Sequence, residues 1–527
     1  MGKKIFFLIF VALAYLLYAR YVLSPQIFKN FSLIDDGQSI KYGIYVRECL
    51  VERKCTSFKS QIIEVLPDVG LSRTGYWLIQ DILYQPPRVD AQFQHELRIY
   101  GFGLALVILF VLSALSARSH AIAVTLGAAL FVTNYSFSEN MIRLGPIEPY
   151  MVLFLGIFSL LFLNLEHISK KLRGPAIIIL SLTLIFLLLL KEASIAILPA
   201  VFILGILFPK VLHKKVLISM LIVSGAIFIL VKMFLGGAQT GPNYSSNYRL
   251  NLLFILQNGL NFLKLLSNSL SPFFEIFLIA APFTLIIKKF RQGIAGSHFV
   301  YWLLVFVSFT VILFPWRYVL DRYLLPSIYA FSILVTILIS RVMNEIEKMS
   351  VFSGWKKVAF QFLAIFTLCN LFFVEAPLNI ARTLNYRNWF ATFIQFEKDQ
   401  VDAIAKVKEG TVYLNAKETI DNWEVVYEIP MHLNYFHGGK PEVERLKLPA
   451  PSEGYLFTRS SLESVLNLES LSNSNYTLLD SKAYHVSRID PNAFRNNFGS
   501  RPIQTLKNPP FLNEGFRYYW EIRSLEI

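Results

Sequence analysis

Two adjacent carboxylates, Asp35 and Asp36, follow shortly after the first long apolar run of the chain. Near a membrane surface, neighbouring carboxylates repel each other, which suits one of them to act as a general base toward an alcohol or an amine. The alternative is an ordinary solvated turn, because Asp-Asp-Gly is common turn chemistry and a carboxylate can cap a following helix. The motif alone leaves both interpretations open, so the other charged residues bear on the choice.

A second group of charged residues stands at the ends of apolar runs. Lys191 is the sharpest case, because Lys-Glu interrupts an almost continuous run of leucine with hardly any loop to solvate it. An ionisable group at the edge of the hydrocarbon costs a few kcal/mol, so a set gathered at one depth indicates a site. Snorkelling to the headgroups and pairing with a neighbouring acid explain any single member better. The set comprises Arg143, Glu148, Lys191, Glu192, Arg317, Asp321, Arg322 and Glu375, and Tyr323 follows Arg322 directly.

Cations that face two carboxylates at one membrane surface have a chemical use. Arginine binds a lipid phosphate as a bidentate fork and lysine binds it as a point charge, and both stabilise the phosphate as it gains charge on leaving. A carboxylate takes the proton from an acceptor that attacks the sugar carbon. We therefore expect Asp35 or Asp36 to be the catalytic base. The residues expected to bind the donor phosphate are Arg143, Lys191 and Arg322. Further candidates for the same site are Glu148, Glu192, Arg317 and Tyr323.

The composition places these residues in a membrane. Of the 527 residues, 54% are hydrophobic and 16% are charged, whereas soluble domains carry about 25% charged residues. The formal net charge of +14 does not indicate nucleic acid, because the basic residues fall in short clusters between apolar runs instead of on one aromatic-rich face. We expect an α-helical integral membrane protein with no nucleic-acid partner.

Apolar runs near the length of about 20 residues needed to cross a bilayer predict about eleven transmembrane helices. The runs are 5–23, 100–117, 121–135, 149–165, 176–190, 193–208, 216–235, 273–287, 300–314, 324–340 and 358–374. The short basic loops fall on the side of Lys3 and Lys4, which the positive-inside rule makes cytoplasmic. An odd number of spans then places the C-terminus outside. Residues 24–98 become a long first extracytoplasmic loop that contains the two aspartates.

The end of the chain is expected to form a separate domain. Residues 1–378 would be the polytopic membrane domain and residues 379–527 an extracytoplasmic mixed α/β domain. Residues 411–414, 454–458 and 484–489 have strand patterns, and residues 389–404 have a helical pattern. No Cys/His cluster has zinc spacing, so no metal site is assigned. Whether a divalent cation binds at the two acids stays open, and the cofactor is therefore unknown.

The charged motifs resemble those of the C-type superfamily of membrane glycosyltransferases, which use lipid-phosphate sugars and include protein O-mannosyltransferases and the lipid A aminoarabinose transferase. The matching features, in order, are Asp35-Asp36 at the start of the first outer loop, an outer turn with Arg143 and Glu148, Lys191-Glu192, and Arg322-Tyr323-Leu324-Leu325-Pro326. They cover the membrane part, roughly residues 1 to 375. The resemblance implies that the catalytic base is Asp35 or Asp36. The inserted domain of the mannosyltransferases is not evident, which leaves the acceptor class open.

The expected function is transfer of a hexose or pentose from a polyprenyl-phosphate donor to a lipid, glycan or protein acceptor at the outer face. Asn30 begins a glycosylation acceptor pattern, and a glycan there would crowd the expected site, which favours a bacterial inner membrane with a cytoplasmic N-terminus and a periplasmic C-terminal domain. An O-antigen-type polymerase or ligase is the nearest alternative, and it would not need the aspartate pair. A lipid-linked glycan transporter is another, although its key charges should lie near the bilayer midplane.

Overall fold

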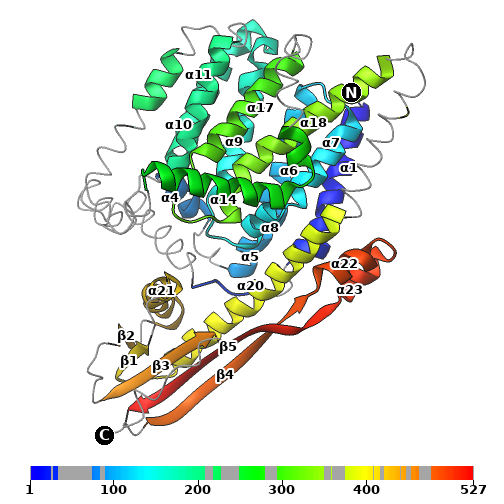
Figure 1. Cartoon of the computed structure of the whole chain (residues 1–527). Coiled ribbons are helices and arrows are strands. Elements are labelled where there is room, and N and C mark those ends of the chain that lie inside the picture. The colour runs from blue at the N-terminus through cyan, green and yellow to red at the C-terminus, as the bar shows by residue number, and fades with distance from the viewer. Residues whose placement is uncertain are drawn as a thin grey trace. The chain divides into compact units, whose positions relative to one another are not determined.

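The computed structural model (Figure 1) describes residues 2–24, 28–33, 74–83, 90–207, 218–226, 249–278, 294–348, 374–407, 409–415, 420–438, 441–446, 453–461 and 476–525, with the single residues 229 and 358. The chain forms two compact units, called unit 1 and unit 2. The described parts of unit 1 fall within Met1–Leu23, Glu48–Ile79 and Leu97–Ile380. Those of unit 2 fall within Ser24–Arg47, Gln80–Glu96 and Ala381–Ile527.

Unit 1 is built from apolar helices. Each expected apolar run that lies within the described residues forms a helix, because its residues are apolar all round and its backbone groups must pair internally in hydrocarbon. The helices, in chain order, are α1 (Gly2–Tyr18), α6 (Gly103–Ser116), α7 (Ala121–Val132), α8 (Tyr135–Ile142), α9 (Glu148–Asn164), α10 (Lys170–Leu190), α11 (Ile197–Leu207), α14 (Leu252–Leu270), α17 (Ile294–Val311) and α18 (Leu325–Lys348).

The expected number of about eleven spans is not confirmed. In the described part of the chain, four helices are long and apolar enough to cross a bilayer, or five if α7 and α8 are one broken span. Those two helices meet at 58°, where Asn134 stops the first and caps the second by accepting a hydrogen bond from the Ser136 amide. Helix α9 and the segments 192–207 and 296–311 are shorter apolar helices. The runs 216–235, 273–287 and 358–374 lie largely outside the described residues.

The surface of unit 1 is that of a membrane protein. Along α1, Phe6 is 73% exposed, Leu13 56% and Leu17 60%, and their spacing puts them on one side of the helix. Soluble monomers rarely expose a continuous apolar stripe of this length to water, whereas lipid chains can cover such a stripe in a membrane. The composition and these exposed helix faces together establish a helical membrane protein.

Helix α14 runs transverse to the bundle helices (Figure 1) and has three different faces. The buried face includes Asn258, whose amide donates 3.0 Å to the Phe314 carbonyl oxygen. A second face is apolar and exposed, and consists of Leu252, Leu253, Leu256, Leu260 and Leu263. A third face is polar and exposed, and consists of Gln257, Asn261, Lys264 and Asn268. A helix with one side in protein, one apolar and one polar suits the plane where lipid meets water.

Unit 2 contains the small α/β fold expected at the end of the chain. Its strands are β1 (Thr411–Asn415), β2 (Glu442–Arg445), β3 (Gly454–Ser461), β4 (Tyr476–Ile489) and β5 (Phe511–Leu525), and they form one sheet in the order β2-β1-β3-β5-β4. Strands β1, β2 and β3 run parallel, with α21 (Ile420–His437) as the crossover between β1 and β2. Strand β5 pairs antiparallel with β3 and β4. The short helices α22 (Pro491–Phe498) and α23 (Pro502–Lys507) connect β4 to β5.

A long helix, α20 (Ala376–Ala405), packs its apolar side on this sheet. Phe396 and Ile404 from the helix meet Val412, Phe457 and Ile522 from the strands in one buried cluster. Each expected strand is found, although β4 is longer than its pattern indicated, and α20 extends beyond the expected residues 389–404. The strand alternation was visible in the sequence because one face of each strand is buried.

Buried His432 on α21 makes the stability of unit 2 depend on pH. Burial lowers the pKa of His432 from 6.5 to about 4, and the neighbouring His437 acts in the same direction. In the unfolded chain, His432 is protonated below pH 6.5, whereas in the folded unit it stays neutral down to about pH 4. The folded unit therefore has its full stability above pH 6.5 and loses stability as the pH falls toward 4. We expect the free energy of unfolding of unit 2 to drop by about 3 kcal/mol over this range. Hydrogen exchange of α21 in the full-length protein, followed from about pH 7 to about pH 4.5, measures the drop, and His432→Gln should flatten it.

Candidate functional site

The turn between α8 and α9 is held from both ends. Helix α8 ends at Arg143, whose backbone is extended, and α9 begins at Glu148 followed by Pro149, a residue favoured in the first helical turn. The buried Arg98 guanidinium, from the π-helical turn η2 (Leu97–Phe102), donates 3.1 Å to the Asn140 carbonyl oxygen and also to that of Pro146. These contacts fix where the Glu148 carboxylate lies.

Lys191 stands at the break between two helices. Helix α10 ends at Leu190, and Lys191 has extended backbone angles (φ −157°, ψ 149°) before the 3-10 helix η4 (Glu192–Ala196) begins. Its ammonium group forms an ion pair with Glu148, and the two side chains are 17% and 4% exposed. A charge this far from water is tolerated because it is paired. The Lys-Glu interruption in the leucine run therefore marks a buried ion pair.

Tyr323 completes the polar side of the site. It lies in the 3-10 helix η5 (Asp321–Leu324), which the Asn140 amide fastens by donating 2.9 Å to the Arg322 carbonyl oxygen. The Lys191 Nζ atom lies 4.4 Å from the centroid of the Tyr323 ring, and the Arg322 guanidinium lies 5.3 Å from it. The π-system of the Tyr323 ring attracts both cations.

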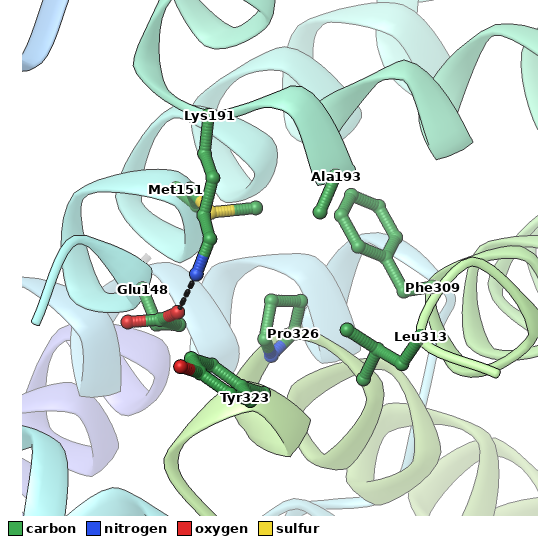
Figure 2. Close-up of a pocket in the computed structure, with 8 residues that line it drawn as sticks. All are labelled: Glu148, Met151, Lys191, Ala193, Phe309, Leu313, Tyr323 and Pro326. Atoms are coloured by element: carbon green, nitrogen blue, oxygen red, sulfur yellow. Dashed lines mark hydrogen bonds and ion pairs between the residues drawn. The ribbon is translucent and has the colours of Figure 1, made fainter. Parts of the chain in front are cut away.

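A pocket opens beside this ion pair (Figure 2). Figure 2 shows Lys191 reaching toward Glu148 above the Tyr323 ring. The remainder of the lining is apolar and consists of Met151, Ala193, Phe309, Leu313 and Pro326. The pocket is shallow, with a cavity volume of about 10 Å³, which is room for about one water molecule. Its lining places a charged group beside an apolar wall.

Of the residues expected at the site, the structure brings a subset together. The pocket lining includes Glu148, Lys191 and Tyr323. The positive charge of Arg322 attracts the Glu148 carboxylate electrostatically. A further buried carboxylate, Glu139, interacts electrostatically with both Arg143 and Arg322.

Two further expected residues lie elsewhere in unit 1, and two are not described. Glu192 opens η4 outside the pocket lining. Arg317 is exposed, with its guanidinium 5.8 Å from the Tyr318 ring. Asp35 and Asp36 lie outside the described residues. Their expected convergence with the cations stays a prediction.

Sequence reasoning missed two buried charges. Arg98 is 2% exposed and Glu139 is 8% exposed. Arg98 is the last residue of the expected first loop, and Glu139 lies four positions before Arg143, but neither was assigned to the site. The available signal was position, since both stand where polar sequence meets an apolar run and an ionisable group there needs a partner. The apolar lining gave no signal, because Phe309 and Leu313 look like any other residues of an apolar helix.

Among the described residues, no group of three or more His, Cys, Asp or Glu side chains is placed to hold a metal ion. No protein-family model matches the chain, and no curated protein matches it.

A comparison with solved structures finds partial likenesses. ArnT from Cupriavidus metallidurans, bound to undecaprenyl phosphate, is 14% identical, matches over 91% of this chain and 96% of its own, and has a TM-score of 0.45. Its apo state gives 14% identity, 90% and 96% coverage and a TM-score of 0.46. The Archaeoglobus fulgidus oligosaccharyltransferase, tethered with an acceptor peptide containing the NVT sequon, gives 10% identity, 82% and 63% coverage and a TM-score of 0.46.

Proposed function

We propose that the protein transfers a sugar from a polyprenyl-phosphate donor to an acceptor at the outer face of a bacterial inner membrane. The acceptor hydroxyl or amine attacks the anomeric carbon of the donor sugar. The bond between that carbon and the phosphate oxygen breaks, and the phosphate leaves with the bonding electron pair. A carboxylate takes the acceptor proton, so charge and atoms balance without a further reactant.

The observation that carries this proposal is the pocket formed around Lys191. A phosphate there would meet the Lys191 ammonium, which lies 4.4 Å from the centroid of the Tyr323 ring, and the Arg322 guanidinium lies 5.3 Å from the same centroid. The apolar wall, with Phe309 and Leu313, suits the first units of a prenyl chain. Cations fixed in advance stabilise the leaving phosphate more than water does, because they need no reorganisation as charge develops.

In this proposal Asp35 or Asp36 is the base. The pair opens the first outer loop of residues 24–98 in the expected topology, on the same face as the outer ends of the apolar runs. Arg143 serves the donor phosphate together with Lys191 and Arg322. The donor sugar is a hexose or a pentose, and the acceptor is a lipid, a glycan or a protein.

The test is a comparison of cell-envelope glycans by mass spectrometry. A deletion strain is complemented with wild type, Asp35→Ala or Asp36→Ala, and the amount of each protein in the membrane is measured. We expect one sugar mass to vanish in the deletion strain and to return with wild type. One of the aspartate variants should restore less of it by about a hundredfold, because a general base contributes about that much to the rate.

Normal restoration by both aspartate variants at normal protein levels would contradict a catalytic role for the pair. Transfer would then be explained better by an O-antigen-type polymerase or ligase, which needs outer-face arginines and no such pair. A deletion strain that keeps every sugar mass, yet accumulates a lipid-linked glycan, would point instead to a transporter.

A further inference from the structure

Helix α8 carries a row of polar side chains, yet it is almost wholly buried in unit 1. Ser136, Ser138 and Asn140 are fully buried, and Glu139 is 8% exposed. Burying a polar side chain is costly unless a hydrogen bond compensates for the water that it loses. A helix of this composition is therefore a poor choice for packing alone, and the contacts of its polar groups indicate what else it does.

The Asn140 side chain connects α8 to η5. Its Nδ2 atom donates to two carbonyl oxygens, 2.8 Å to that of Ser136 in the same helix and 2.9 Å to that of Arg322 in η5. The Arg322 carbonyl belongs to the peptide group that joins Arg322 to Tyr323. Because a peptide group is planar, a hydrogen bond that fixes this carbonyl also restrains the two Cα atoms from which both side chains start.

A second asparagine fastens the beginning of η5. Asn134, which caps α8, donates 3.0 Å through its Nδ2 atom to the Ser269 carbonyl oxygen. The Ser269 hydroxyl in turn donates 3.4 Å to the Asp321 carboxylate, at the first residue of η5. The two ends of α8 therefore hold two successive residues of η5, Asp321 through Ser269 and Arg322 directly.

Asn140 is not the residue that stability alone would favour. Its Oδ1 atom is buried and has no hydrogen-bond partner among the described residues. A buried oxygen without a donor costs free energy that a smaller or apolar side chain would avoid. Conflicts of this kind are found mainly at functional sites. The feature that Asn140 adds is its reach to η5, because a serine in its place would bond only the Ser136 carbonyl oxygen of its own helix.

We infer that Asn140 is a positioning residue for the cations of the proposed donor-phosphate site. The Tyr323 ring centroid lies 4.4 Å from Lys191 Nζ and 5.3 Å from the Arg322 guanidinium. Asn140 holds the backbone from which this ring and this guanidinium extend, so it acts on Arg322 directly and on Lys191 through the Tyr323 ring. The inference rests on the proposed function and deepens it, because it names a group that keeps the phosphate site in register.

The experiment measures how strongly the full-length protein prefers a lipid phosphate over the same lipid without phosphate. Undecaprenyl phosphate and undecaprenol are added in equal amounts to the protein in detergent micelles, and native mass spectrometry gives the ratio of the two bound lipids. We expect wild type to prefer the phosphate by about tenfold or more, because hydrogen bonds between charged groups contribute about that much. Lys191→Met should remove most of this preference.

Asn140→Ala should lower the preference for phosphate about fivefold, because displaced cations bind the phosphate less well. Sugar transfer in the complemented strain should fall by about a hundredfold, since a misplacement of about 1 Å can cost that much in rate. Asn140→Ser serves where Asn140→Ala does not accumulate. It keeps a donor for the Ser136 carbonyl oxygen but does not reach Arg322, so it should be the more stable variant and lose the preference for phosphate to the same extent.

Asn258→Ala is the matched control for stability. The Asn258 amide also donates to two carbonyl oxygens of unit 1, those of Phe314 and Trp316. The loop that contains these carbonyls contributes apolar Leu313 to the pocket lining. The control should therefore lower the thermal midpoint of the protein, as Asn140→Ala does, without changing the ratio of the two bound lipids.

The outcomes separate the inference from the function on which it rests. If Lys191→Met loses the preference for phosphate while Asn140→Ala and Asn140→Ser keep it, the phosphate site stands and the positioning role is overturned. An equal loss of preference in Asn258→Ala also overturns that role, because any loss of stability would then have the same effect. A wild-type protein without preference removes the phosphate site from the proposed function, and the inference falls with it.

Discussion

Replacing Lys191 with methionine is expected to lower sugar transfer about a thousandfold, because the cation nearest the pocket no longer stabilises the leaving phosphate. The same change should lower stability. Glu148 has a side chain only 4% exposed, and it would lose its ion-pair partner, which typically costs about 3 kcal/mol. The loss of transfer by itself therefore does not reveal whether Lys191 serves the phosphate or only its neighbour.

A double variant separates these two roles. Lys191→Met combined with Glu148→Gln removes both charges, so no carboxylate remains buried alone and most of the stability should return. Transfer should stay low, because the phosphate still lacks its cation. The measurements are the thermal midpoint of the purified protein and the glycan profile. Lys171→Met, an exposed lysine at the opposite end of the same helix, is the control. Recovered transfer in the double variant would make the Lys191 role purely structural.

Sequence patterns were sufficient for the class of the protein and for part of the site. Lys191 stood out because a charge inside a leucine run is costly unless it has a partner. In the structure, Lys191 forms a buried ion pair. Tyr323 and Arg322 were found from a short motif, and they lie beside it. In each case the signal was a polar residue where the local sequence required an apolar one. Such conflicts mark functional sites more often than random positions do.

Sequence patterns did not show which of these residues contact each other. Glu148 and Lys191 were both singled out, yet nothing in the local pattern joined two residues 43 positions apart. The hydrogen bond from the Ser32 hydroxyl to Glu397 is a stronger case, since these two residues are separated by 365 positions. Hydrophobic periodicity reports which face of a helix is buried but not what covers it. The number of spans is not confirmed, since four helices of the described residues, or five with α7 and α8 counted as one span, are long and apolar enough to cross a bilayer.

Replacing Arg98 with methionine is expected to reduce the free energy of unfolding of unit 1 by about 4 kcal/mol. Its guanidinium bonds two backbone carbonyl oxygens, of Asn140 and Pro146, and lies 4.7 Å from the Tyr150 ring centroid. Burying an arginine has its own desolvation cost, so a hydrophobic substitute is sometimes neutral. Here it is not, because methionine would leave two buried carbonyls without donors.

The shape of the guanidinium matters as much as its charge. Arg98→Lys keeps the charge but offers a single ammonium group, which cannot reach both carbonyls in the fixed fork of an arginine. It should therefore recover less than half of the lost stability. Tyr76→Phe is the matched control for the same turn, since the Tyr76 hydroxyl donates 3.0 Å to the Gly145 carbonyl oxygen, and its loss should cost only about 1 kcal/mol. Denaturant or thermal unfolding in a fixed detergent compares the variants.

The turn that Arg98 fastens also carries Glu148, so transfer should follow stability in this series. Arg98→Met moves the start of α9 relative to Lys191, which follows the end of α10, and the ion pair that orients the lysine weakens. Proteins in the membrane at equal amounts should then rank in transfer as wild type, Tyr76→Phe, Arg98→Lys and Arg98→Met. Full transfer by a well-folded Arg98→Met would show that the turn tolerates displacement. It would also show that the position of Glu148, and with it the Lys191 ion pair, does not limit the reaction.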